Sequence, residues 1–168
     1  PKATKNTVEQ AGARAAHRRD AVALCRFLAW LDREGPTGQY TEMETAERLL
    51  ALRAEGERFR GESFPAISGS GPNGAIVHYR ATAASNRRLA AGDLYLIDSG
   101  AQYLDGTTDV TRTVLIGDAA ADIAEIRDRF TRVLKGHIAI ATLRWPKGVA
   151  GPHVETCLLY TSPSPRDS

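Results

Sequence analysis

The stretch LYLIDSGAQYLDGTTDVTRTVLI, residues 94–116, decides the fold. It contains two runs rich in β-branched, aliphatic and aromatic residues, 94–97 and 110–116, which are typical of strands. Between them lies Asp105-Gly106, a dipeptide that signals a chain reversal. The stretch therefore predicts an antiparallel hairpin.

Helices are predicted before this hairpin. Thr7 and Gln10 fit the pattern of a capping box, and apolar residues at helical spacing continue to Glu34, before a Gly-Pro pair. Thr41 and Glu44 repeat the pattern, so a second helix is expected to run from there to between residues 53 and 59.

The rest of the chain adds one strand and one helix. Residues 75–79 form a short β-rich run, and residues 118–145 carry apolar side chains at helical spacing until Pro146, with His137 expected on the packed side. The order helix, helix, strands, helix predicts an α+β fold with an antiparallel sheet.

Composition excludes several classes of protein. The 168 residues are 42% hydrophobic and 25% charged, values typical of a globular domain rather than a disordered chain. A net charge of +2 gives no reason to expect nucleic acid, and no apolar run is long enough to suggest a membrane span. Two cysteines, Cys25 and Cys157, and no signal peptide favour a cytoplasmic location.

Asp98 and Asp109 are the central candidates for chemistry. A tight turn at Asp105-Gly106 would separate them by about 13 Å, whereas a longer loop or a bulge would place them opposite each other, about 5 Å apart. We predict the second register, in which both carboxylates share a face and need a proton or a divalent cation between them. The alternative is that both are solvated aspartates near a turn.

His78 is the third candidate, and it follows a glycine-rich loop at residues 68–74. A histidine there can bind a metal, carry a proton or donate to a substrate carbonyl, and it can equally be structural. The loop lacks the Gly-Lys-Ser/Thr ending of a phosphate-binding loop. A Ser-His-Asp hydrolase is disfavoured because no G-x-S-x-G motif is present.

Three segments resemble a known family: residues 67–79, 97–103 and 106–113, the last reading GTTDVTRT. Together they are similar to Xaa-Pro aminopeptidase (aminopeptidase P), a pita-bread metallopeptidase related to methionine aminopeptidase, prolidase and creatinase. The resemblance extends from about Lys5 to Glu155. It implies the first half of a pita-bread catalytic domain, with a curved antiparallel sheet and flanking helices.

The resemblance also implies a function. It assigns Asp98 and Asp109 as ligands of two divalent metal ions, with manganese favoured over zinc or cobalt, and Asp109 as the bridging ligand. His78 matches the histidine that contacts substrate near the scissile bond and takes part in catalysis. The expected partner is a peptide with proline at its second position, with neither nucleic acid nor a membrane involved, and a homodimer is compatible with the family.

The chain departs from the family pattern near its end. The histidine and two glutamates that complete the family's five ligands have no match here, and residues 157–168 resemble the translation of a sequencing adapter. We therefore expect residues 1–156 to be an incomplete catalytic domain and residues 157–168 to be a non-native tail. A fragment of this kind is expected to be inactive. Creatinase-like or prolidase-like hydrolysis and a non-catalytic binding module remain alternatives.

Overall fold

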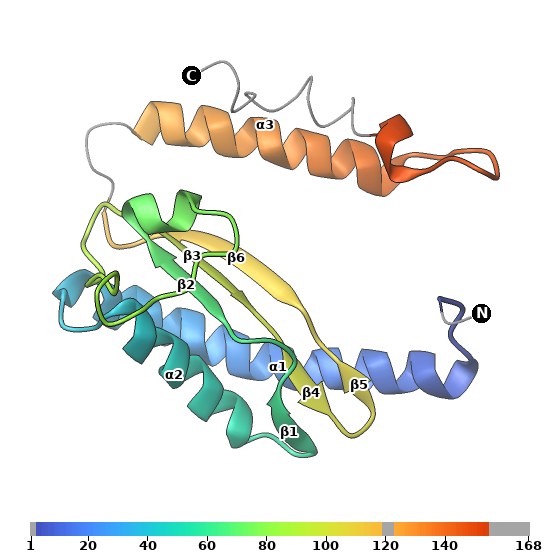
Figure 1. Ribbon diagram of the computed structural model, residues 1–168, viewed down its shortest axis with the longest axis horizontal. Helices are drawn as coiled ribbons and strands as arrows, with labels where there is room; N and C mark the ends of the chain where they lie inside the picture. The colour runs from blue at the N-terminus through green and yellow to red at the C-terminus, as the bar shows by residue number, and fades with distance from the viewer. Residues whose placement is uncertain (1–2, 119–122, 155–168) are drawn as a thin grey trace. The chain divides into compact units, whose positions relative to one another are not determined.

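The computed structural model describes residues 3–118 and 123–154, which fall into two compact units divided at Ala120 (Figure 1). Each unit is described separately. The second unit contains the helix α3 (Ile123–Thr142). The first unit contains, in chain order, α1 (Thr7–Glu34), η1 (Gly35–Thr37), α2 (Glu42–Ala54), β1 (Phe59–Glu62), β2 (Ile67–Ser70), η2 (Gly71–Ala75), β3 (Leu94–Ser99), β4 (Ala101–Tyr103), β5 (Gly106–Thr107) and β6 (Val110–Leu115).

Both predicted helices of the first unit form, but the cap of α1 differs from the prediction. Asn6, not Thr7, is the cap: its side chain accepts from Glu9 N at 2.9 Å, and the Glu9 carboxylate accepts from Asn6 N at 2.8 Å. Asparagine is a strong cap and glutamate suits the third helical position, so this box prevails over the neutral Thr7–Gln10 pattern. The Thr41–Glu44 box of α2 is confirmed.

The predicted hairpin forms, although its register differs from both alternatives. Strand β3 pairs with β6 so that Asp98 lies opposite Thr111, and not opposite Asp109. The same register continues through β4 and β5, where Tyr103 pairs with Gly106. The turn therefore falls at Leu104-Asp105, one residue before the predicted Asp105-Gly106.

Contacts at the tip of the hairpin explain this turn. The Asp105 carboxylate forms ion pairs with Arg19 and with Arg58. Gly106 packs directly on α1, where an added Cβ would lie only 3.0 Å from the Cβ of Ala16. These contacts with distant residues select the turn, and turn preference alone cannot reveal them.

One face of the sheet β2-β3-β6 packs against the helices, and Figure 1 shows α1 and α2 on that side. The buried side chains of β3 are Tyr95, Ile97 and Ser99, every second residue of the strand. They meet a core supplied mainly by α1 and α2, which comprises Ala23, Leu24, Phe27, Trp30, Leu31, Leu49 and Leu52. The opposite face carries Leu94, Leu96 and Asp98 because strand side chains alternate.

The predicted strand at residues 75–79 does not form. The chain instead makes the short helix η2 and a turn, which leaves Ile76 and Val77 53% and 83% exposed. Tyr79 is buried because its hydroxyl reaches a buried carboxylate in α2. A short β-rich run is ambiguous evidence for a strand when such a polar contact competes.

In the second unit, α3 confirms the predicted helix over a shorter range than 118–145, and residues 119–122 lie outside the described part. Its apolar side includes Phe130, Val133 and Ile138, each at least half exposed, and His137 is exposed rather than packed. The proposed tail, residues 157–168, also lies outside the described residues. Among the helices that are described, none is long and apolar enough to cross a membrane.

Candidate metal and substrate site

Asp98 and Asp109 share the face of the sheet that α1 and α2 leave open. Asp98 alternates with the buried Ile97 and Ser99, and it pairs with Thr111, two residues beyond Asp109. Thr108 N donates to Ala101 O at 2.8 Å, which continues this register past Asp109. The two aspartates are therefore diagonal neighbours, a relation that separates side chains by about 7 to 8 Å.

The environment of Asp98 fits a cation. Its Oδ1 atom is buried and has no hydrogen-bond partner, while Asp109 nearby is exposed. A buried carboxylate oxygen without a donor is costly, and a cation shared with a second carboxylate would offset that cost. Within residues 3–118 and 123–154, however, no three acidic, histidine or cysteine side chains gather into a set that could hold a metal. Among the described residues, the carboxylates available for such a site on this face are those of Asp98 and Asp109.

The loop that carries His78 packs on the same face of the sheet. An added Cβ at Gly69 of β2 would lie 2.9 Å from Gly74 Cα in η2, and one at Gly74 would lie 3.5 Å from Leu96 Cβ. Leu96 is two residues from Asp98 on β3 and so shares its face. Glycine at position 69 allows η2 to lie this close to the strands.

His78 itself is exposed and has an unusual backbone. Its φ of 54° lies in the left-handed region, which non-glycine residues seldom occupy. Such a conformation persists only where surrounding contacts hold it, and it is often found at functional sites. The adjacent Tyr79 is 6% exposed and provides such a contact.

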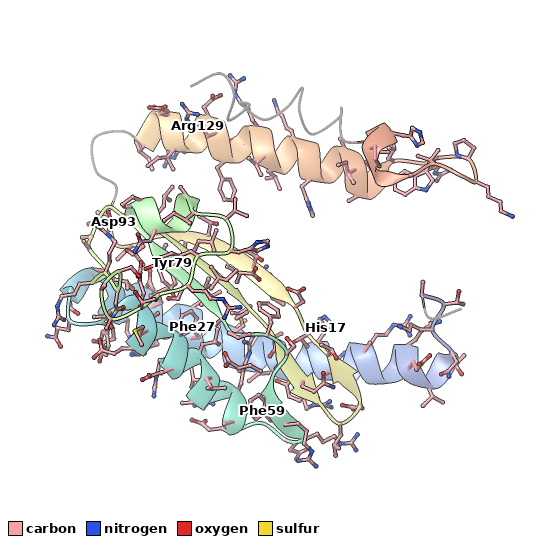
Figure 2. The ribbon with its side chains drawn as sticks, viewed as in Figure 1. His17, Phe27, Phe59, Tyr79, Asp93 and Arg129 are labelled. Atoms are coloured by element: carbon pink, nitrogen blue, oxygen red, sulfur yellow. The ribbon has the colours of Figure 1, made fainter. Side chains whose placement is uncertain are left out.

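Glu42 is the residue at the centre of those contacts, and sequence patterns alone do not single it out. It is the first residue of α2 and is fully buried. Its carboxylate accepts from Tyr79 OH at 2.8 Å and from the backbone N–H of Ser70 at 2.7 Å. The polar residues Ser70 and Asn73 in the glycine-rich loop, with Tyr79 shortly after it, were the available signal that a buried acceptor faced them. Figure 2 labels Tyr79 in the first unit.

A second buried carboxylate lies away from this loop. Asp20 pairs with Arg53 at 2.8 Å and accepts from Tyr103 OH at 3.0 Å. Burial, followed by the nearby Asp20 charge, raises the pKa of Tyr103 to about 12. Burial likewise raises the pKa of Tyr79, so both phenols stay protonated and donate to their carboxylates at neutral pH.

Comparison with known proteins assigns the chain to a family. The model of metallopeptidase family M24 matches residues 11–157. Xaa-Pro aminopeptidase 2 from Sus scrofa is 47% identical over 154 residues, which cover 92% of this chain and 22% of the pig protein. The family match covers most of the described chain and includes His78, Asp98 and Asp109. The chain belongs to metallopeptidase family M24.

Solved structures agree with this assignment. An X-prolyl aminopeptidase from Caenorhabditis elegans, described as a cytosolic enzyme with a di-nuclear active site, superposes with a TM-score of 0.84 at 40% identity, over 95% of this chain and 26% of that one. A prolidase from Thermococcus sibiricus gives a TM-score of 0.73 at 27% identity, over 94% of this chain and 40% of that one. The expected α+β, pita-bread fold is confirmed, and the chain spans only a fraction of these relatives.

Proposed function

We propose that the protein containing this segment is a metal-dependent aminopeptidase that hydrolyses the bond between an N-terminal residue and a following proline. The buried, unpartnered Oδ1 of Asp98, on the face shared with Asp109, is the observation that carries the proposal. The similarity to Xaa-Pro aminopeptidases from pig and C. elegans supports the substrate class. The cytosolic nematode enzyme supports a cytoplasmic location.

Asp98 and Asp109 would hold two divalent cations, for which we favour manganese over zinc or cobalt. Bound divalent ions lower the pKa of a water molecule and polarise a peptide carbonyl. Asp98 presents an oxygen that lacks a hydrogen-bond partner, and Asp109 presents an exposed carboxylate that would be the ligand common to both ions. The carboxylates also offset positive charge that would otherwise repel a substrate's N-terminal ammonium group.

His78 would act on the substrate. Its imidazole is exposed on a loop that packs on the face of Asp98, and an imidazole N–H can donate to the carbonyl oxygen as negative charge develops there. The same donation would orient the peptide with its proline after the scissile bond. This role needs a fixed imidazole, since a misplaced donor stabilises the charge poorly.

Within residues 3–118 and 123–154, no group of three or more potential metal-binding side chains is present. We propose that residues 1–156 are the first part of the catalytic domain, that residues 157–168 are foreign to it, and that the remaining ligands follow in the full-length protein. The likeness to a prolidase makes Xaa-Pro dipeptide cleavage the second candidate. Longer Xaa-Pro peptides and Xaa-Pro dipeptides, assayed side by side, distinguish the two activities.

The test is hydrolysis of an Xaa-Pro peptide by the full-length protein with added Mn²⁺. We expect activity that a chelator removes and that Asp98→Asn or Asp109→Asn lowers by at least about 100-fold, since each removes a charged ligand. Asp118→Asn, an exposed aspartate beyond β6, is the matched control and should retain activity. Turnover by the 168-residue chain alone, or chelator-resistant activity, would contradict the proposal.

A further inference from the structure

We propose that Glu42 is a positioning residue that holds the loop bearing His78 in its working conformation. The proposal rests on the proposed function, in which the His78 imidazole acts on the substrate. Glu42 would not touch the substrate, because it is fully buried. Its effect would pass through the hydrogen bonds that it accepts from residues 70–87.

The Glu42 carboxylate accepts hydrogen bonds from both ends and from the middle of the loop formed by residues 70–87. Oε1 accepts from Ser70 N at 2.7 Å and from Asn73 Nδ2 at 3.0 Å. Oε2 accepts from Tyr79 OH at 2.8 Å and from Arg87 N at 3.0 Å. A buried carboxylate is tolerated only when donors satisfy it, and every side-chain or backbone donor found for this one belongs to the loop. One charged group thus ties together a segment that makes few strand or helix hydrogen bonds.

The hydrogen bond from Tyr79 to Glu42 fixes the residue that directly follows His78 in the chain. Tyr79 is buried and anchored, whereas His78, one residue earlier, is exposed with a φ of 54°. Tyr79 OH is also 3.0 Å from Ser85 O, which connects the anchor to the return arm of the loop. Releasing the anchor would let residue 78 relax to an ordinary negative φ, and that change would swing the imidazole away from its present direction.

The position of Glu42 in the helix adds to its strength as an acceptor. It is the first residue of α2, where the free N–H groups and the helix dipole favour negative charge. Its own backbone N–H donates to Arg87 O at 2.9 Å, so helix and loop are joined at the same point. Glu42 is therefore bonded to residue 87 through both its backbone N–H and its carboxylate.

A double-mutant cycle in the full-length protein tests this inference. Glu42→Gln replaces one carboxylate oxygen with an NH2 group, which in either orientation of the amide would face a backbone donor, Ser70 N or Arg87 N. Glu44→Gln makes the same change at an exposed site of the same helix. With an Xaa-Pro peptide and saturating Mn²⁺, we expect Glu42→Gln to lower kcat by about 10- to 100-fold, as expected for a misplaced catalytic group. The KM of Glu42→Gln and its bound metal per chain should stay near the wild-type values. Glu44→Gln should keep a kcat near that of the wild type.

The cycle is completed in a background without the imidazole. His78→Asn removes it, and in that background Glu42→Gln should change kcat by less than about 2-fold, because residues that act through one another are non-additive. Equal losses in both backgrounds, or loss of bound metal, would overturn the inference. Either result would mean that Glu42 stabilises the domain in general and does not specifically position His78.

Two further measurements cover the cases in which activity is uninformative. If the wild type hydrolyses no Xaa-Pro peptide, the proposed function fails, and amide hydrogen exchange across residues 70–87 then tests the positioning role alone. Exchange should be faster in Glu42→Gln than in Glu44→Gln, and equal rates would overturn the role.

A tyrosine pair serves if Glu42→Gln does not fold. Tyr79→Phe removes the hydroxyl that donates to Glu42 and should lower kcat. Tyr103→Phe removes a matched donor to buried Asp20 and should leave kcat unchanged. Equal kcat values for the two variants would overturn the role.

Discussion

His78 combines two properties that can be separated by substitution, its imidazole and its left-handed backbone. A φ of 54° is accepted by asparagine with little cost, whereas a β-branched residue clashes with its own backbone there. The imidazole, by contrast, is lost in any replacement. Stability and activity should therefore respond differently to two variants at this position.

We expect His78→Asn to leave the free energy of unfolding within about 0.5 kcal/mol of wild type and His78→Val to lower it by about 1 to 2 kcal/mol. Both should reduce Xaa-Pro hydrolysis to a similar level. Urea denaturation of the full-length variants, with peptide hydrolysis measured in parallel, gives the comparison. Equal stability of the two variants would mean that residue 78 does not hold this backbone conformation in solution.

Strand alternation predicted that Asp98 and Asp109 share a face, but it could not fix the distance between them. The shared face follows from any hairpin register of the right parity, and the structure has such a register. The turn position depends on Arg19, Arg58 and α1, which are far away in sequence. Glu42 was missed for the same reason, because its burial arises only when the loop closes over α2.

Among the helices and strands, clear sequence patterns predicted the elements correctly, whereas overlapping or weak patterns did not. The hairpin strands and the Thr41–Glu44 cap formed where the sequence placed them. At the start of α1, two capping patterns overlap with a shift of one residue, and local spacing alone does not choose between them. The run at residues 75–79 failed because a tertiary contact of Tyr79 outweighed a weak strand preference.

The observed cap of α1 gives a direct test. Asn6→Ala removes the side-chain acceptor for Glu9 N and should lower the free energy of unfolding by about 0.5 to 2 kcal/mol. Thr7→Ala changes a residue already inside the helix and should have a much smaller effect. Denaturant unfolding of both variants in one protein background makes the comparison. A larger loss for Thr7→Ala would restore the cap predicted from the Thr7–Gln10 pattern.

Each of the two units, taken by itself, has a surface that we would expect a complete M24 catalytic domain to cover. In the first unit, β6 lies at one edge of its sheet, and the face carrying Asp98 and Thr111 is not packed against α1 or α2. In the second unit, α3 exposes Phe130, Val133 and Ile138 along its length. Open strand edges and exposed apolar helix faces both favour self-association.

We therefore expect the isolated 168-residue chain to aggregate or to unfold without a sharp transition, because much apolar surface would remain in water. The measurements are size-exclusion chromatography, dye binding to exposed apolar surface and thermal unfolding followed by circular dichroism. Phe130→Lys with Val133→Lys should raise the soluble fraction, since it places charge on that apolar side. Arg129→Lys with Arg132→Lys on the same helix is the charge-conserving control and should change little. A soluble monomer that melts cooperatively would instead show that these residues form a self-sufficient domain.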